Sequence, residues 1–168
     1  MKKLVLLMLA MCAMSLGASA QRFALIDMEY ILQNVPAYES ANSEIEQLSK
    51  QWQAEVQKVS DEAKSLYESY QSAKNLTEAQ RTQRENAIVE KEKSAADLRR
   101  KYFGQEGELA KKQQELMQPI MDDIYEVVKA IAQDKGYSMV IDRASASSII
   151  FASPNIDISD DVLAELGE

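Results

Sequence analysis

Apolar residues recur with a helical period through the middle of this chain, in a stretch from Pro36 to Gly104 whose interior contains neither proline nor glycine. The first half of the stretch spaces them by three or four residues, at Ile45, Leu48, Trp52, Val56, Val59, Ala63, Leu66, Tyr70 and Ala73. This spacing is typical of a coiled-coil seam, and one additional four-residue step relaxes the supercoil locally. Pro36 suits the first turn of a helix, where a missing N–H costs little. The pattern therefore predicts a long helix that begins near Pro36.

A polar interruption at residues 75–78 predicts the tip of an antiparallel helical hairpin. Thr77 can cap a second helix, with Gln80 at the capping-box position. The apolar positions of this return helix are Ile88, Ala95, Leu98, Tyr102, Leu109, Leu116, Ile120, Ile124, Val127 and Ile131. They are sparse before Leu109, and a sparse seam buries little area, at roughly 25 cal/mol per Å². We expect the distal hairpin to be marginally packed and mobile, and the proximal part to be firmly packed.

Three residues of the return helix are poor helix formers. Gly104 and Gly107 each cost about 1 kcal/mol relative to alanine in a helix interior, and they mark either a joint or a local weakness that the helix tolerates. Pro119 removes one helical hydrogen bond and is expected to kink the helix.

Short strand patterns flank the helical region. Residues 22–27 are consistent with a buried strand, and residues 28–33 with a helical turn. Gly136 is a candidate end for the return helix, and residues 137–142 and 147–151 are typical of two further strands around a small-residue turn. Ser159 is a plausible N-cap of a short C-terminal helix.

A body of about three short strands is too small to support long helices by itself. The apolar strand at 147–151 would also be an exposed edge if it were unpaired. Both features favour an oligomer that pools strands and covers their edges.

The first twenty residues have the features of a secretory leader. Met1-Lys2-Lys3 is basic, the run from Leu4 to Leu16 is apolar, and Ala18-Ser19-Ala20 supplies small residues for cleavage after Ala20. The apolar run is too short to span a bilayer core of about 30 Å. A lipoprotein acylated at Cys12 is the alternative, and the bulky Met11 before it disfavours that processing.

Cleavage would leave no cysteine and no histidine, so the mature chain lacks a thiol nucleophile, an imidazole base, a disulfide and a Cys/His metal site. It also lacks a G-x-x-x-x-G-K phosphate loop. Asp122-Asp123 and Asp160-Asp161 are adjacent pairs that point about 100° apart on a helix, so we expect solvated surface charge rather than a catalytic dyad. Asp27 and Asp142 stand at strand ends, where hydrogen bonding to nearby backbone is expected. The sequence predicts no enzyme, no cofactor and no metal.

The charge of the chain is acidic but unevenly distributed. Without Lys2 and Lys3 it carries 17 basic and 27 acidic residues, a net charge of −10, which excludes a general nucleic-acid binder. Residues 74–112 nevertheless carry 10 basic and 7 acidic side chains. The basic cluster Arg99-Arg100-Lys101 is the best candidate for an anion-binding patch. The alternative is a solvated helix with ion pairs such as Asp97 with Lys101.

Four motifs in order resemble those of the Skp/OmpH family of periplasmic chaperones, over essentially the whole mature chain. They are Asp27-Met28-Glu29-Tyr30-Ile31-Leu32, Leu116-Met117-Gln118-Pro119-Ile120, the segment from Gly136-Tyr137 to Asp142, and Asp157-Ile158-Ser159.

The resemblance implies a mostly helical α+β fold and a homotrimer shaped like a jellyfish. A small β-body of residues 21–37 and 113–168 would hold three helical-hairpin arms of residues 38–112. Members capture unfolded outer-membrane β-barrel proteins in the cavity between the arms, in the periplasm and without ATP. Well-known members are basic, whereas this chain is acidic, so charge steering of clients is not carried over. Contact with nucleic acid is not implied, and contact with the membrane would be at most peripheral. The alternative function is an envelope spacer or adaptor that binds one folded partner.

Four aromatic residues of the arm exceed what its thin seam needs, and they are candidate client contacts: Tyr67, Tyr70, Tyr102 and Phe103. The alternative is packing within the hairpin, because Trp52 and Tyr102 would lie at similar heights on opposite helices.

Overall fold

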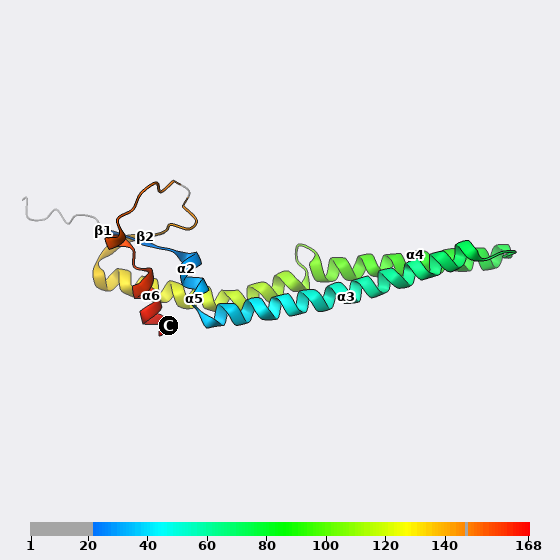
Figure 1. Ribbon diagram of the computed structural model, residues 1–168, viewed down its shortest axis with the longest axis horizontal. Coiled ribbons are helices and arrows are strands. Elements are labelled where there is room, and N and C mark those ends of the chain that lie inside the picture. The colour runs from blue at the N-terminus through cyan, green and yellow to red at the C-terminus, as the bar shows by residue number, and fades with distance from the viewer. Residues whose placement is uncertain (1–21, 147) are drawn as a thin grey trace, which may run out of the picture. The chain divides into compact units, whose positions relative to one another are not determined.

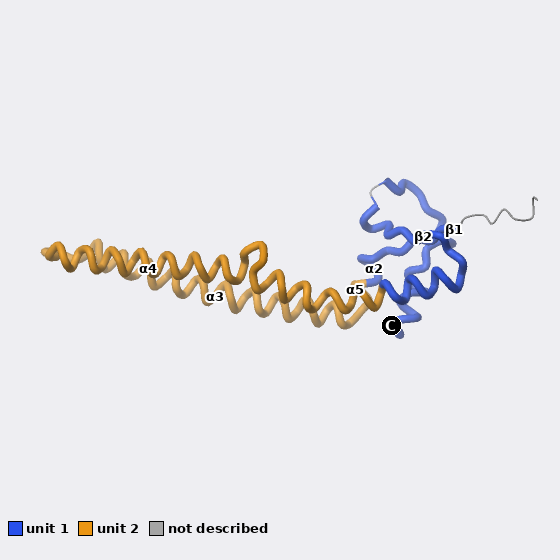
Figure 2. The backbone as a smooth tube through the Cα atoms, turned by 180° about the vertical axis from the view of Figure 1, so that it is seen from behind, with its two compact units in different colours: residues 1–31, 125–168 blue, residues 32–124 orange. Residues whose placement is uncertain are grey.

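The computed structural model describes residues 22–146 and 148–168, and the chain divides into two compact units. Figure 2 shows one unit made of the residues up to 31 together with residues 125–168, and a second unit made of residues 32–124. The expected leader of residues 1–20, with Cys12 and its cleavage site, lies outside the described residues. The fold is a mostly helical α+β structure with a small sheet, as the sequence predicted.

The second unit is an antiparallel helical hairpin (Figure 1). Helix α3 (Pro36–Ser72) has 37 residues and begins with Pro36 at its first turn, as expected, and such a helix is about 55 Å long. Helix α4 (Glu78–Phe103) returns alongside it. The predicted capping box at the tip is confirmed, since the Thr77 hydroxyl accepts from the Gln80 N–H at 3.3 Å and the Gln80 side chain accepts from the Thr77 N–H at 3.0 Å.

The seam between α3 and α4 is thin, as the sequence predicted. The buried residues of the two helices are Ala41, Val56 and Ala63 in α3, and Ile88, Ala95 and Tyr102 in α4. Three of these six are alanines, so little apolar area is removed from water per turn. Leu66 belongs to the predicted seam but is 39% exposed.

The return helix is not continuous, which corrects the expectation that Gly104 and Gly107 lie inside one helix. Helix α4 ends at Phe103, and helix α5 (Glu108–Lys135) begins after a gap of four residues. The backbone closes on itself here: a Cβ on Gly104 would lie 2.4 Å from the Arg100 carbonyl oxygen, and one on Gly107 would lie 2.7 Å from the Tyr102 carbonyl oxygen. Only glycine fits such approaches. Helix α5 continues through Pro119.

The first unit contains the sheet. Strands β1 (Arg22–Ile26) and β2 (Tyr137–Asp142) pair in parallel, and the opposite side of β1 contacts the chain near residue 158, where the Leu25 carbonyl accepts from the Ile158 N–H at 2.9 Å. Helix α2 (Met28–Gln33) follows β1, and the short helices η2 (Pro154–Ile156) and α6 (Ser159–Leu166) end the chain. Gly136 precedes β2 in the left-handed region with φ of +69°, as expected for the end of α5.

Two predictions about the first unit are wrong. The described part of the expected strand at 147–151 is not a strand, and Ile150 is 101% and Phe151 84% exposed. The second edge of β1 is occupied near residue 158, and residues 148–151 do not add to the outer edge of β2. Ser159 is also not an N-cap, because that position is Ile158 and the Ser159 hydroxyl is buried in other hydrogen bonds.

Candidate functional site

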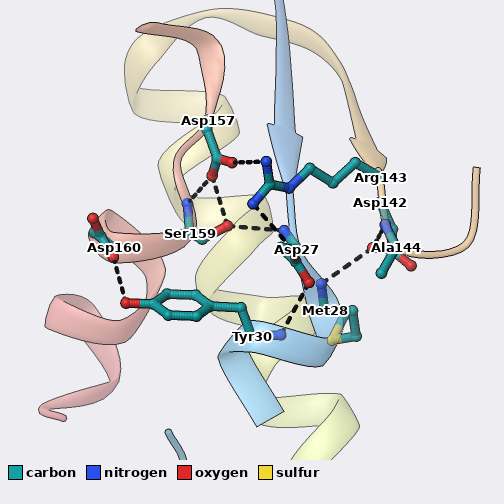
Figure 3. Close-up of polar contacts among 9 residues, drawn as sticks. All are labelled: Asp27, Met28, Tyr30, Asp142, Arg143, Ala144, Asp157, Ser159 and Asp160. Atoms are coloured by element: carbon teal, nitrogen blue, oxygen red, sulfur yellow. Dashed lines mark hydrogen bonds and ion pairs between the residues drawn. The ribbon is translucent and has the colours of Figure 1, made fainter. Parts of the chain in front are cut away.

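A polar cluster fastens the end of β1 to the start of α6 (Figure 3). The Arg143 guanidinium bridges the carboxylates of Asp27 at 3.1 Å and Asp157 at 3.4 Å. Ser159 joins the same two aspartates, because its hydroxyl accepts from the Asp27 N–H at 2.8 Å and donates to the Asp157 carboxylate at 2.7 Å. The cluster thus ties three distant segments of the chain together.

Asp27 and Asp142 hold backbone groups at the ends of the two strands, as predicted. The Asp27 carboxylate accepts from the Tyr30 N–H at 3.0 Å, and the Asp142 carboxylate accepts from the Met28 N–H at 3.1 Å and the Ala144 N–H at 3.0 Å. Burial alone would raise the pKa of Asp142, but hydrogen bonds from the Ser145 side chain and from nearby backbone amides outweigh it and lower that pKa. Both carboxylates therefore have structural partners.

The adjacent aspartates of α6 serve two different partners. The Asp160 carboxylate accepts from the Tyr30 hydroxyl at 3.1 Å, and this hydrogen bond, followed by the charge of Asp160, raises the pKa of Tyr30. Asp161 forms an ion pair with Lys135 at 2.5 Å. The two side chains do not act as a dyad, as predicted. Both are exposed charges on the helix surface, as predicted, and each has a partner.

The charged groups of this cluster are already paired with one another or with neighbours, which limits the chemistry that they can perform. A hollow of about 380 Å³ opens beside it, and the charged groups on its wall are Arg143, Asp157 and Asp160, each of which has a partner described above. Among residues 22–146 and 148–168, no three or more His, Cys, Asp or Glu side chains gather to hold a metal ion. Within the same residues, the helices include none with the length and apolar character needed to cross a bilayer.

The hairpin contains the aromatic candidates, and Tyr102 is buried inside it. Its ring stacks on Trp52, with ring centroids 4.9 Å apart and planes 2° from parallel, and it is 6% exposed. Its hydroxyl donates to Glu55 at 2.8 Å, and this hydrogen bond is the main reason why the pKa of Tyr102 is raised. Tyr102 therefore packs within the hairpin, and the predicted alignment with Trp52 is confirmed.

The other three aromatic candidates differ in accessibility. Tyr70 is half-buried and donates its hydroxyl hydrogen to Glu85 on the opposite helix. Phe103 is half-buried and meets Tyr102 edge-on, with ring centroids 6.4 Å apart. Tyr67 is 49% exposed, and its hydroxyl accepts from the Gln71 amide at 2.8 Å. Tyr67 and Phe103 thus present more ring surface to a ligand than Tyr102 does.

The basic cluster is divided by its local partners. Arg100 pairs with Asp97 at 2.7 Å, which corrects the expected pairing of Asp97 with Lys101. The Lys101 ammonium lies instead over the Tyr102 ring, 4.9 Å from its centroid. Arg99 is exposed and forms no ion pair within the described part of the chain. The three neighbouring cations therefore have different local partners, and their role as an anion-binding patch stays a prediction.

Arg99 lies between two hollows that follow one side of the α3–α4 seam, which we call the hairpin groove. One hollow of about 410 Å³ is lined by Ser60, Ala63, Lys64, Tyr67, Glu92, Ala95, Ala96 and Arg99. The next, of about 390 Å³, is lined by Gln53, Val56, Gln57, Arg99 and Phe103. The groove brings together Tyr67, Arg99 and Phe103, whose common location depends on the helix register and was missed from the sequence. The ion pair between Lys91 of α4 and Glu62 of α3, at 2.6 Å, reports this register, so aligning the two residues in the sequence could have indicated the common location.

Comparison with known proteins agrees with this architecture. A family model described as outer membrane protein (OmpH-like) matches residues 22–166. The chain belongs to the OmpH-like family.

Relatives of this OmpH-like chain include proteins named chaperone protein Skp. The one from Yersinia enterocolitica is 26% identical over 93% of this chain and 97% of its own length. The one from Pectobacterium atrosepticum is 24% identical over the same shares of the two chains. A crystal structure of a proposed OmpH-like outer membrane chaperone from Caulobacter crescentus CB15 has a TM-score of 0.71 at 14% identity, covering 89% of this chain and 86% of that chain. This last likeness shows a shared fold.

Proposed function

We propose that this OmpH-like chain is an ATP-independent chaperone that holds unfolded outer-membrane β-barrel proteins and prevents their aggregation. The observation that carries the proposal is the hairpin itself. Half of the buried residues of its two helices are alanines, and aromatic and cationic side chains remain along one side of the seam. The Skp chaperones among its relatives support the same conclusion.

Holding by many weak contacts explains how such a protein works without a nucleotide. A client segment that rests on a helix surface cannot pair its strand edges with those of another client, and such pairing is the route to aggregation. Each contact is worth little, so a client leaves when folding offers it more buried area. The activity is binding rather than catalysis.

A homotrimer would supply the cavity. The first unit exposes apolar side chains that a solvated monomer would rarely leave open: Phe23 at 43%, Met139 at 54%, Ile150 at 101% and Phe151 at 84%. Neighbouring copies would cover them. In this assembly the three hairpins would surround the client.

The proposed location is the periplasm. The leader of residues 1–20 would direct export and be removed after Ala20, leaving an acidic mature chain with at most peripheral membrane contact.

The experiment uses the mature protein in two steps. Sedimentation analysis should give three times the mass of one chain. Dilution of a urea-denatured outer-membrane β-barrel into buffer with this protein should then suppress light scattering at near-stoichiometric amounts without ATP. A compact monomer that leaves scattering unchanged would refute the proposal. The alternative, an envelope spacer or adaptor, predicts one tight complex with a folded partner and no suppression.

A further inference from the structure

We infer that the hairpin groove binds one extended segment of about six residues, with alternating apolar side chains and a carboxylate placed against Arg99. This inference rests on the proposed function, and it names the kind of client segment that the hairpin selects.

The dimensions of the groove fit an extended chain. On α3 it extends from Gln53 to Tyr67, a rise of about 21 Å at 1.5 Å per helical residue. An extended segment advances about 3.3 Å per residue, so about six residues fill this length. The small side chains of Ser60, Ala63 and Ala96 leave the central space open.

The two ends of the groove are aromatic and its middle is not. Tyr67 lines the first hollow, and Phe103 lines the second. Alternate side chains of an extended segment point to the same face at intervals of about 7 Å, so those facing the groove can meet both rings. An alternating pattern of apolar residues is what a β-barrel strand carries, which connects the groove to the proposed clients.

The charge of the groove favours an anion. Its wall carries two cations, Lys64 and Arg99, against one carboxylate, Glu92. Lys64 has Glu68 at 3.9 Å, whereas Arg99 forms no ion pair within the described part of the chain. A guanidinium offers two parallel N–H donors to a carboxylate. Arg99 therefore selects an acidic side chain on the bound segment, although this chain is itself acidic overall.

The test compares two capped seven-residue peptides with alternating Phe and Ser around one central residue, which is Glu in the first and Lys in the second. Each carries a fluorophore, and binding to the mature protein is followed by anisotropy at low salt. We expect the Glu peptide to bind more tightly than the Lys peptide. The substitution Arg99→Gln should weaken the Glu peptide about threefold, the effect of one exposed ion pair, and remove the preference.

The neighbouring residue provides a matched control. Arg100→Gln makes the same charge change, but Arg100 already pairs with Asp97 and does not line the groove, so it should leave both affinities unchanged. Ala96→Leu should fill the groove and weaken both peptides, whereas Ser94→Leu, on a different part of α4, should not. Helicity measured by circular dichroism shows that each variant is folded.

The results separate this inference from the proposed function. Equal binding of the Glu and Lys peptides, or equal effects of the Arg99 and Arg100 substitutions, would overturn the groove as a selective site even if the protein still suppresses aggregation. Loss of suppression in the unmodified protein would instead refute the proposed function.

Discussion

Replacing Tyr102 by alanine should loosen the hairpin at the end of α4. Tyr102 is 6% exposed, stacks on Trp52, and donates a hydrogen bond to Glu55. Removal of a buried aromatic side chain costs about 3 to 5 kcal/mol. The exposed sides of a two-helix structure can relax into the space, so we expect the lower value, about 3 kcal/mol.

Most of that cost comes from the ring, and a second variant separates the hydroxyl. Tyr102→Phe keeps the stack and loses only the hydrogen bond to Glu55, a loss of about 1 kcal/mol. Glu55 is solvent-exposed and can turn to water, so no buried charge is left unpaired.

Amide hydrogen exchange measures the effect where it occurs. The amides of α4 should lose protection by on the order of a hundredfold in Tyr102→Ala, with a change in the fluorescence of Trp52, the only tryptophan. Tyr67→Ala is the control, because that side chain is 49% exposed and its loss should change stability by less than about 0.5 kcal/mol. Similar losses of protection in the two alanine variants would refute the reasoning that Tyr102 fastens the hairpin.

Three further predictions concern the turn between α4 and α5 and the first unit. Gly107→Ala should destabilise the protein by about 1 to 3 kcal/mol in urea unfolding, because its Cβ would meet backbone at 2.7 Å, whereas Gln105→Ala should be neutral; equal midpoints would contradict the steric argument. The lowered pKa of Asp142 means that its stabilisation is present above about pH 4 and is lost as pH falls through the folded value. Asp142→Asn should therefore make the urea midpoint less sensitive to pH between 5 and about 2.5, and an unchanged pH dependence would exclude this role. Arg143→Ala should lower stability by about 1 kcal/mol at low salt and less at high salt, because both of its ion pairs are partly exposed; a loss independent of salt would point to packing instead.

The hairpin could be predicted from sequence because its signals are local. The seam spacing of α3, Pro36 at its start and the Thr77 cap each depend on residues within one or two turns. The residues left the break after Phe103 as one of two alternatives, because two glycines cost only about 2 kcal/mol in a helix. The break is decided by the close approach of other backbone atoms to Gly104 and Gly107, and such an approach cannot be read from residue types.

The missing strand and the hairpin groove depend on distant pairing. The pattern around Ile150 describes a segment suited to a strand, but a strand also needs a partner edge, which the residues themselves do not specify. The same reason hid the common location of Tyr67 and Arg99. Each lies on a separate helix, and the register between those helices determines whether they share one side.

The four-residue gap between α4 and α5 has a mechanical consequence. Helix α3 is uninterrupted opposite it, between Glu44, which pairs with Lys112 beyond the gap, and Trp52, which stacks on Tyr102 before it. Two helices packed about 10 Å apart must differ in arc length by about 5 Å if the pair bends through 30°. Four residues can extend to about 13 Å, so the side formed by α4 and α5 can lengthen at the gap, whereas the continuous α3 cannot. We therefore expect the hairpin to bend most easily at this level, with α3 on the inside of the curve, because the turn can lengthen while both helices stay wound.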